Sequence, residues 1–208
     1  MLSVNEWFYF TECLDKKTCS KIRSTAKKKW KQSTVTNRKG VTEKERISKE
    51  VDIVDNKIRI SDVVWTSEKW IYDTIWPWLQ GANERAGWKY DIRAAEPMQI
   101  TRYKKGGFYT FHRDGSGDHL SAYNEPDNKL KHGYVRKLSM TVLLNDNYEG
   151  GEFQFSICNQ EKCERHVPEF NKIGSIIVFP SDIEHRVAPV TKGVRYSLVV
   201  WFLGPPFK

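Results

Sequence analysis

The sequence VRYSLVVWFLG, residues 194–204, has the pattern of a β-strand that is covered on both faces. Alternate side chains of an extended chain leave opposite faces. The odd positions place Arg195, Ser197, Val199 and Trp201 on one face. The even positions carry large apolar side chains on the other. Because both faces are largely apolar, we expect this strand to lie inside a layered β-structure.

Further short segments rich in β-branched and aromatic residues precede this strand, from about Tyr90 onward. Polar or glycine-containing turns separate them, and many short strands at such spacing are typical of a sandwich or barrel. The segments are AAEPMQITRY (94–103), FYTFHRD (108–114), RKLSMTVLLN (136–145), GEFQF (151–155), GSIIVFP (174–180) and HRVAPV (185–190).

The first helix is expected from Thr11 or Asp15 to about Lys31, and residues 32–49 after it are polar and turn-prone. The apolar residues of this helix recur at the spacing of one helical face. They are Leu14, Ile22, Ala26 and Trp30.

A second helix is expected after Thr66 or Ser67, either of which is a suitable N-cap, and Pro77 would kink it. The apolar residues on one side of it are Trp70, Ile71, Ile75 and Leu79. Between the two helices, the sequence VDIVDNKIRISDVVW (51–65) alternates apolar and polar residues around Asp55 and Asn56. This alternation predicts two short strands joined by a turn.

Helices followed by strands predict an α+β fold in which the N-terminal helices brace one sheet of a β-sandwich. No repeat or linker divides the chain, so we expect one domain over residues 1–208. A helical and basic part would occupy residues 1–89, and a β core residues of about 90–204.

The composition is that of a folded chain, with 39% hydrophobic and 13% aromatic residues. No apolar run reaches the roughly 18 to 20 residues that a membrane-spanning helix needs. The first residues lack a basic leader, and their apolar run, residues 7–10, is too short for a signal peptide. These features predict a protein without membrane association, located in the cytoplasm.

The net charge of +8 is concentrated near the N-terminus, where residues 1–50 hold 13 Lys or Arg and 6 Asp or Glu. A basic surface with Trp30 embedded in it could bind nucleic acid or an acidic partner. The alternative is a solvated lysine-rich helix face whose tryptophan is buried.

Four cysteines, Cys13, Cys19, Cys158 and Cys163, are expected to be free thiols, because no signal peptide precedes them. A zinc site formed by Cys158, Cys163 and His166 is an alternative, although it lacks a fourth ligand.

His112 and Asp114 are the first candidate site residues, because two positions apart on a strand their side chains share a face. His185 begins a later strand and is the best third ligand. Two histidines and one carboxylate on one face of an octahedron are the arrangement that holds non-haem Fe(II) and leaves three positions open. The three residues therefore predict an iron site.

Arg195 is the second candidate, because a strand covered on both faces would bury its guanidinium group. A buried arginine needs an anion, and its planar fork suits a carboxylate. The hydroxyl group of Ser197 can add a further hydrogen bond.

Together these features resemble the 2-oxoglutarate and Fe(II)-dependent oxygenases, specifically the prolyl 4-hydroxylase branch and its microbial peptidyl hydroxylase relatives. The resemblance extends over roughly residues 57–202 and depends on an ordered set of motifs. These are RIS (59–61) with DVVW (62–65), MQITRY (98–103), GG (106–107) leading to Tyr109, His112 and Asp114, then LSMTVLLN (138–145), YEGGEF (148–153), GSIIVFP (174–180), and His185 with Arg195.

The resemblance implies a double-stranded β-helix, or jelly roll, in which His112, Asp114 and His185 hold Fe(II). It also implies that Arg195 pairs with the distal carboxylate of the cosubstrate 2-oxoglutarate, to which Tyr103 offers a hydroxyl group. The reaction would consume O2, release succinate and CO2, and hydroxylate a C–H bond. L-Ascorbate is a further candidate cofactor. Because Asp114 is present, hydroxylation is expected and not halogenation.

The substrate implied by the resemblance is a protein or peptide segment that contains proline. Arg59 and Ser61 match an R-x-S element that lies by the peptide groove of prolyl hydroxylases, and Tyr109 and Trp201 would lie near the iron. Gly150 and Gly151 would serve a turn or bulge. Collagen-type enzymes usually carry Lys at the position of Arg195, which loosens the inference to a collagen-like substrate.

The segment between Asp114 and Arg136 is long and polar, as lids and substrate loops often are. Its histidines, His119 and His132, are expected to face solvent. Two alternatives to peptide hydroxylation remain. Nucleic-acid demethylases typically carry a second arginine where Trp201 stands, so that reaction is disfavoured. A metal-free binding module is disfavoured because no ligand is missing.

Overall fold

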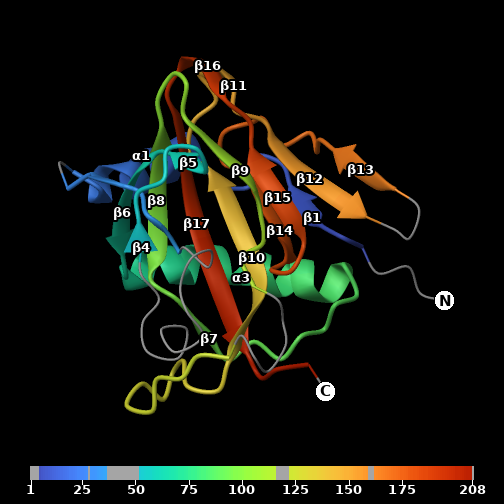
Figure 1. Cartoon of the computed structure of the whole chain (residues 1–208). Coiled ribbons are helices and arrows are strands. Elements are labelled where there is room, and N and C mark those ends of the chain that lie inside the picture. The colour runs from blue at the N-terminus through green and yellow to red at the C-terminus, as the bar shows by residue number, and fades with distance from the viewer. Residues whose placement is uncertain (1–4, 28, 37–51, 116–121, 159–161, 208) are drawn as a thin grey trace.

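The computed structural model describes residues 5–27, 29–36, 52–115, 122–158 and 162–207. Two antiparallel sheets form its layers (Figure 1). The major sheet contains, in spatial order, β1 (Phe8–Phe10), β14 (Ile176–Pro180), β10 (Val135–Leu143), β17 (Arg195–Gly204), β8 (Met98–Tyr103), β6 (Asp62–Thr66) and β2 (Lys31–Gln32), with β7 (Ala94–Ala95) also paired to β17.

The minor sheet contains, in spatial order, β13 (Cys163–His166), β12 (Phe153–Cys158), β15 (Glu184–Val187), β9 (Phe108–His112) and β5 (Arg59–Ile60). Two small strand pairs complete the described β-structure. They are β11 (Tyr148–Gly150) with β16 (Val190–Gly193), and β3 (Val35–Thr36) with β4 (Asp52–Ile53). Each segment that the alternation predicted as a strand therefore contains one.

The strand β17 lies between β10 and β8 and is covered on both faces, as its sequence predicts. Leu198, Val200 and Phe202 are fully buried in a cluster shared with the helices. Arg195 and Ser197, on the opposite face, are each 1% exposed. This second face looks toward the minor sheet, so β17 separates an apolar layer from the space between the sheets.

The helix α1 (Lys16–Thr25) begins where the sequence predicts, because the Asp15 side chain accepts a hydrogen bond from the backbone N–H of Thr18 at 2.6 Å. It ends earlier than Lys31, so Trp30 lies beyond it. The physical reason is the backbone of Lys27, whose φ of +42° takes the chain out of the helix.

The helix α3 (Lys69–Arg85) crosses behind the strands of the major sheet (Figure 1). The prediction of Thr66 or Ser67 as its N-cap is wrong. Thr66 still belongs to β6, and Glu68 occupies the cap position without a side-chain hydrogen bond. Pro77 lies inside α3, which continues beyond it for two turns.

The segment 51–65 contains the predicted strands and turn, and the backbone N–H of Arg59 donates to the carbonyl of Asp55 at 2.9 Å. The two strands do not pair with each other. β4 pairs with β3, and β5 pairs with β9 of the minor sheet. Most of the polar stretch at 32–49 lies outside the described residues.

The expectation of four free thiols is wrong for Cys158 and Cys163, which form a disulfide. They are directly opposite each other in the β12–β13 hairpin, so pairing requires no rearrangement of the chain. The disulfide also removes the proposed zinc site with His166. Cys13 and Cys19 remain free, and burial raises the pKa of each thiol to about 11.

Apolar side chains from both helices and from the major sheet share one cluster; among them are Ile22 of α1 and Ile75 of α3, both fully buried. A second cluster fills part of the space between the sheets, with Phe155 and Phe179 at its centre. Within the described residues, neither helix has the length and apolar character needed to cross a lipid bilayer.

We predict that Ile75→Ala lowers the free energy of unfolding by about 2 to 5 kcal/mol, because it leaves a cavity between α3 and the major sheet. Denaturant titration followed by circular dichroism measures this change. Lys69→Ala on the same helix, whose side chain is 85% exposed, is the control and should change stability by less than about 0.5 kcal/mol. Equal losses of unfolding free energy in the two variants would contradict a stabilising contact of Ile75 between α3 and the major sheet.

Candidate functional site

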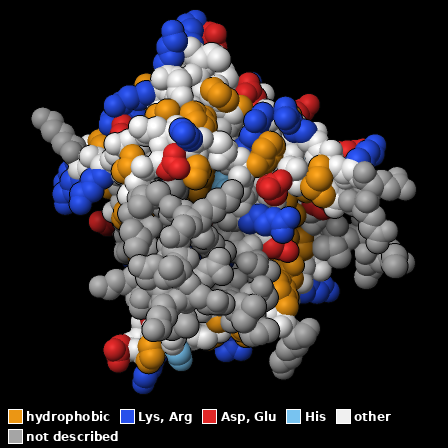
Figure 2. Space-filling model, in the orientation of Figure 1, with side chains coloured by type: hydrophobic (Ala, Val, Ile, Leu, Met, Phe, Trp, Pro, Cys, Tyr) orange, Lys and Arg blue, Asp and Glu red, His pale blue; other side chains and the backbone are white. Residues whose placement is uncertain are grey.

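A pocket of about 910 Å³ lies between the two sheets and is lined by residues from both. The outward-facing surface of this region shows a histidine side chain near its centre, between hydrophobic and polar neighbours (Figure 2).

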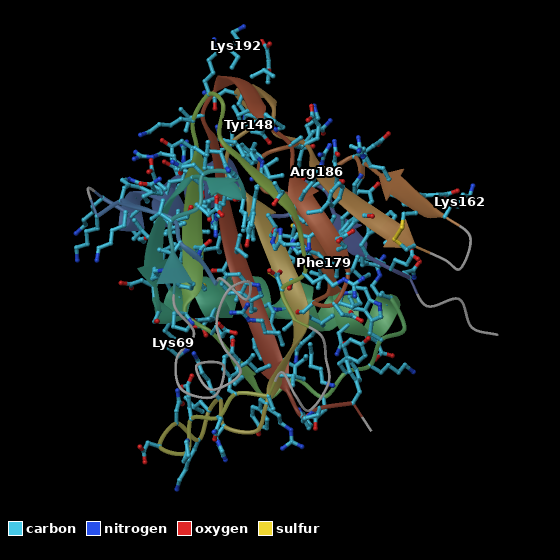
Figure 3. The ribbon with its side chains drawn as sticks, in the orientation of Figure 1. Lys69, Tyr148, Lys162, Phe179, Arg186 and Lys192 are labelled. Carbon is cyan, nitrogen blue, oxygen red and sulfur yellow. A yellow bond between two sulfur atoms is a disulfide. The ribbon has the colours of Figure 1, made fainter. Side chains whose placement is uncertain are left out.

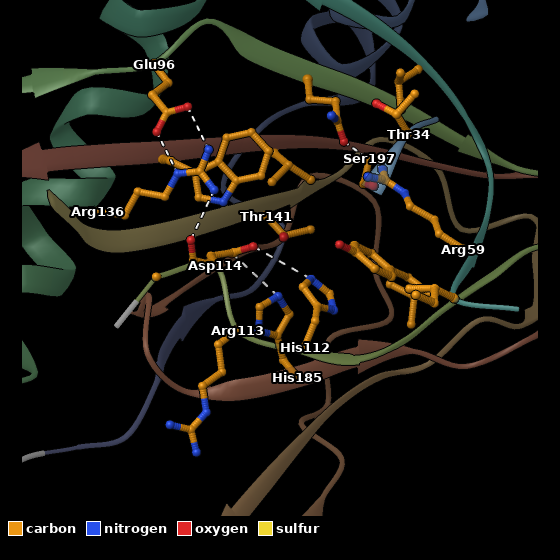
Figure 4. Close-up of a pocket in the computed structure, with 18 of the residues that line it drawn as sticks. Thr34, Arg59, Glu96, His112, Arg113, Asp114, Arg136, Thr141, His185 and Ser197 are labelled. Atoms are coloured by element: carbon orange, nitrogen blue, oxygen red, sulfur yellow. Dashed lines mark hydrogen bonds and ion pairs between the residues drawn. The ribbon is translucent and has the colours of Figure 1, made fainter. Parts of the chain in front are cut away.

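His112, Asp114 and His185 come together at this pocket (Figure 4). Strand pairing places His185 of β15 directly opposite His112 of β9, and Asp114 follows β9 by two residues. The Nε2 atom of His112 lies 3.6 Å from Asp114 Oδ1, and that of His185 lies 3.5 Å from Oδ2. One ligand atom from each residue lies within 4.8 Å of the other two, so the three could hold one metal ion.

The two imidazole rings are oriented for metal binding. The Nδ1 atoms of His112 and His185 lie 2.8 and 3.0 Å from the backbone carbonyls of Thr110 and Ile183. A carbonyl only accepts, so each Nδ1 carries a proton and donates it, and the neutral form of either ring then has its lone pair on Nε2. Burial and the neighbouring His185 lower the pKa of His112 to about 3, which favours the neutral ring.

The carboxylate of Asp114 is held from a third direction. The hydroxyl group of Ser139 donates to Asp114 Oδ2 at 2.7 Å, and Ser139 is itself hydrogen-bonded to Ser181. Burial alone would raise the pKa of Asp114, but the nearby His185, His112 and Arg136 with the Ser139 hydrogen bond lower it overall. The charged form is therefore favoured.

Arg195 lies at the inner side of the pocket, with its side chain fully buried. One guanidinium nitrogen donates to Ser197 Oγ at 3.1 Å, while Nε has no hydrogen-bond partner within the described residues. No described carboxylate lies within 4 Å of this cation, so it has free capacity for an anion. The ring of Tyr103, its cross-strand neighbour, is 5.6 Å away.

Gly151 makes room for this guanidinium group. Its φ of +68° is a conformation that side-chain-bearing residues rarely adopt. A Cβ atom there would lie only 3.0 Å from Cδ of Arg195 and 2.9 Å from a methyl group of Val190. The preceding Gly150 coincides with a shift in the β11–β16 register, so the expected turn or bulge is present.

A buried ion pair that the sequence reasoning missed lies on the other side of the metal-binding cluster. Arg136 donates two hydrogen bonds to Glu96, at 2.6 and 2.8 Å, and a third to the backbone carbonyl of Asp114 at 3.1 Å (Figure 4). Its guanidinium group lies over the ring of Trp201, 4.3 Å from the centroid. Tyr123, from the long loop before β10, donates to Glu96 at 2.7 Å. The sequence signal that could have identified this pair is a charged residue of opposite sign in each of two apolar strand segments, Glu96 in 94–103 and Arg136 in 136–145.

Arg59 lines the same pocket and is 7% exposed. It donates to Ser61 Oγ at 2.8 Å and to Gln99 Oε1 at 2.7 Å, and it lies over the ring of Tyr109. Tyr109 in turn stacks on His112, with 3.5 Å between ring centroids. Ser61 is buried beneath Arg59 and does not line the pocket.

The remaining predicted residues differ in whether they line the pocket or lie at the surface. Trp201 lines the pocket, and its indole nitrogen is buried without a described partner. Trp65, which is 53% exposed, lies beside it, with 5.9 Å between the ring centroids and a tilt of 37° between the rings. His132 is exposed, as expected, whereas His119 lies outside the described residues.

Comparison with the sequences of known proteins supports the resemblance to the oxygenases. The family model of the 2OG-Fe(II) oxygenase superfamily matches residues 98–203. A PKHD-type hydroxylase of Xylella fastidiosa (strain M12) is 34% identical over 114 residues, covering 50% of this chain and 43% of the relative. A PKHD-type hydroxylase of Synechococcus sp. (strain CC9902) is 35% identical over 112 residues, covering 53% and 42%. The chain thus spans less than half the length of these relatives.

Solved structures share the fold. A Pseudomonas putida prolyl-4-hydroxylase superposes with a TM-score of 0.60 at 18% identity, covering 97% of this chain and 94% of that one. A Trichoplax adhaerens prolyl hydroxylase, solved with a peptide fragment of hypoxia inducible factor, gives 0.63 at 16% identity, covering 97% and 84%. The jelly-roll architecture expected from the sequence is therefore confirmed.

The matched region, residues 98–203, begins with β8 and ends within β17. It contains His112, Asp114, His185 and Arg195, the four residues that meet around the pocket. The chain belongs to the 2OG-Fe(II) oxygenase superfamily.

Proposed function

We propose that this protein is an Fe(II)- and 2-oxoglutarate-dependent dioxygenase that hydroxylates a peptidyl residue, with proline the first candidate, and that residues 1–208 act as one domain. One observation carries the proposal: three metal-ligand side chains and a buried guanidinium group without a carboxylate partner face the same pocket. We also predict that the protein is located in the cytoplasm and that the N-terminal helices brace one sheet.

The donor set fits the two groups. The Nε2 atoms of His112 and His185 and the carboxylate of Asp114 would hold Fe(II). Arg195 would bind the distal carboxylate of 2-oxoglutarate, with hydroxyl groups of Tyr103 and Ser197 beside it. When bound, iron and 2-oxoglutarate would supply the oxidation of a substrate C–H bond by O2, with release of succinate and CO2. L-Ascorbate is included among the cofactors to be tested.

The chain's own contribution is positioning and exclusion of water. Backbone carbonyls fix both imidazole rings, and Ser139 fixes the carboxylate, so the ligands need little reorganisation. The aromatic wall at Phe153, Phe155 and Phe179 covers His185. These rings make this side of the site apolar, while the opposite side faces the rest of the pocket.

A peptide substrate is supported by the shape and chemistry of the rest of the pocket. Trp65 and Trp201 offer apolar surface, and Arg59, Glu96 and Arg136 offer polar contacts around it. Such a mixture suits an extended, proline-containing segment. The prolyl hydroxylases of similar fold give the same preference. Other peptidyl residues, small molecules or nucleic acids are outcomes of the substrate test, as is a binding module without catalysis.

We predict that His112→Ala and Asp114→Ala each abolish succinate release and weaken Fe(II) binding. Each variant removes one of three protein ligands. Anaerobic titration with Fe(II), followed by absorbance in the presence of 2-oxoglutarate, gives a readout independent of turnover. His132→Ala, at an exposed histidine, is the matched control. Full turnover by either ligand variant would rule out this metal site.

We predict that Arg195→Ala weakens 2-oxoglutarate binding by about 2 to 5 kcal/mol, a loss of roughly 30-fold or more. A carboxylate would lose its buried ionic partner. Isothermal titration of the Fe(II) protein with 2-oxoglutarate measures the loss, and Arg93→Ala, at an exposed surface arginine, should leave affinity unchanged. Loss of iron with unchanged 2-oxoglutarate affinity would assign Arg195 another role.

We predict a +16 mass change on a proline-containing peptide incubated with the protein, Fe(II), 2-oxoglutarate and O2. A panel of peptides with proline and matched peptides with alanine in its place, read by mass spectrometry, tests the residue. Hydroxylation of a different residue would redirect the substrate while leaving the chemistry intact. Cosubstrate turnover without modification of any peptide would contradict a peptide substrate.

A further inference from the structure

The outer face of the minor sheet carries an arginine cluster beside the pocket. Phe111 lies on β9, and the side chains of two arginines from other strands of the sheet approach its ring. The guanidinium carbon of Arg186 lies 4.8 Å from the centre of the Phe111 ring, and that of Arg165 lies 5.9 Å from it. Arg186 is on β15, next to β9 in the sheet (Figure 3), and Arg165 is on β13, the edge strand. We call these side chains, together with Arg113, the Phe111 cluster.

Arg113 connects the Phe111 cluster to the catalytic pocket. It follows His112 in the chain, yet its side chain is exposed and points away from the three ligand residues (Figure 4). Phe111 and Arg113 both line the pocket. The cluster therefore continues outward from the site and is not an isolated patch of the surface.

The arginines of the Phe111 cluster form no ion pair within the described residues, although Glu152 lies near enough to Arg186 to act on its pKa in the raising direction. None of its three arginines has a described carboxylate within 4.0 Å. Arg186 instead donates to the neutral Gln154 at 2.8 Å. Glu184 lies two positions before Arg186, on the same face of β15. Glu164, next to Arg165, is paired with Lys162 and His166. Burial and the neighbouring Arg165 lower the pKa of Arg186, as like charges do.

The two guanidinium groups beside the Phe111 ring, with the exposed Arg113, favour a partner that supplies both carboxylates and apolar contact. Arginine binds carboxylates through a planar fork and packs on aromatic rings. An acidic segment of a polypeptide meets both requirements, and it can be covalently continuous with a residue that enters the pocket. A second contact outside the pocket would raise the effective concentration of that residue at the site.

We propose that the Phe111 cluster docks an acidic segment of the polypeptide substrate, next to the residue that is hydroxylated. This inference rests on the proposed function for the identity of the partner as a peptide. It adds that the preferred substrate sequence is acidic and that the Phe111 cluster is the surface that binds it.

Binding of labelled peptides in the absence of iron tests the proposal independently of catalysis. The probe is a fluorescein-labelled, proline-containing peptide with four glutamates on one side of the proline, and its match carries four glutamines. Fluorescence anisotropy should give about tenfold tighter binding of the glutamate peptide at low ionic strength, and the difference should shrink with salt. Equal affinities for the two peptides would overturn the proposal.

The double variant Arg165→Glu with Arg186→Glu should remove the preference for the glutamate peptide and leave the affinity for the glutamine peptide within about twofold. Arg165→Gln with Arg186→Gln keeps the test valid if charge reversal prevents folding, which circular dichroism reports. Lys16→Glu with Lys17→Glu, at exposed positions of α1, makes the same change in net charge elsewhere. An equal loss in that control would assign the effect to overall charge and overturn the docking surface.

Two further outcomes separate this inference from the proposed function. Selective binding of the glutamate peptide without hydroxylation of any peptide would support the docking surface and contradict the reaction. Tighter binding of a labelled single-stranded RNA than of the glutamate peptide, lost in the Arg165 and Arg186 variants, would overturn the choice of polypeptide as the partner.

Discussion

The pairing of β9 with β15 that sets His112 opposite His185 is the constraint on which the site depends. It places His112 and His185 opposite each other, with their Nε2 atoms directed at Asp114. A shift of either strand by one residue would turn its histidine to the other face of the sheet. Val187 of β15 packs in the cluster between the sheets together with Phe153 and Phe155 of β12, which pairs with β15, so core packing fixes which face of the sheet His185 occupies. The packing of the core therefore also sets the geometry of the metal-binding residues.

The arginines around the pocket differ in their partners, and Arg59 is held by the neutral side chains of Ser61 and Gln99. Where a charge serves the scaffold, it has a partner, as Arg136 has in Glu96. Where it faces the pocket at the inner side, as Arg195 does, the described residues leave it with a hydroxyl group only. Burying a cation without a counterion is costly unless a ligand supplies one. The contrast between these two arginines is what distinguishes a binding position from a structural ion pair in this fold.

The sequence predicted the strands and the four central site residues because both depend on local pattern. Segments rich in β-branched and aromatic residues identified most strands of the two sheets but not β1, β2 and β13. Chemistry of residue type identified His112, Asp114, His185 and Arg195. Pairing partners were less accessible, since β5 joins β9 instead of forming a hairpin with a strand of its own segment. The Cys158–Cys163 disulfide was missed for a similar reason: its cysteines meet only through hairpin register. Its presence also weakens the use of cysteine content to infer a reducing compartment.

The position of β17 in the major sheet has a consequence for how the chain folds. This strand comes last in the sequence among the described elements, yet it lies between β8 and β10 and pairs with both. The two neighbours cannot complete their hydrogen bonding until β17 arrives, so a nascent chain would expose two unpaired strand edges during synthesis. Such edges promote association with other chains. Non-local pairing of this kind also slows folding. The protein is therefore expected to fold after, and not during, the emergence of its earlier strands.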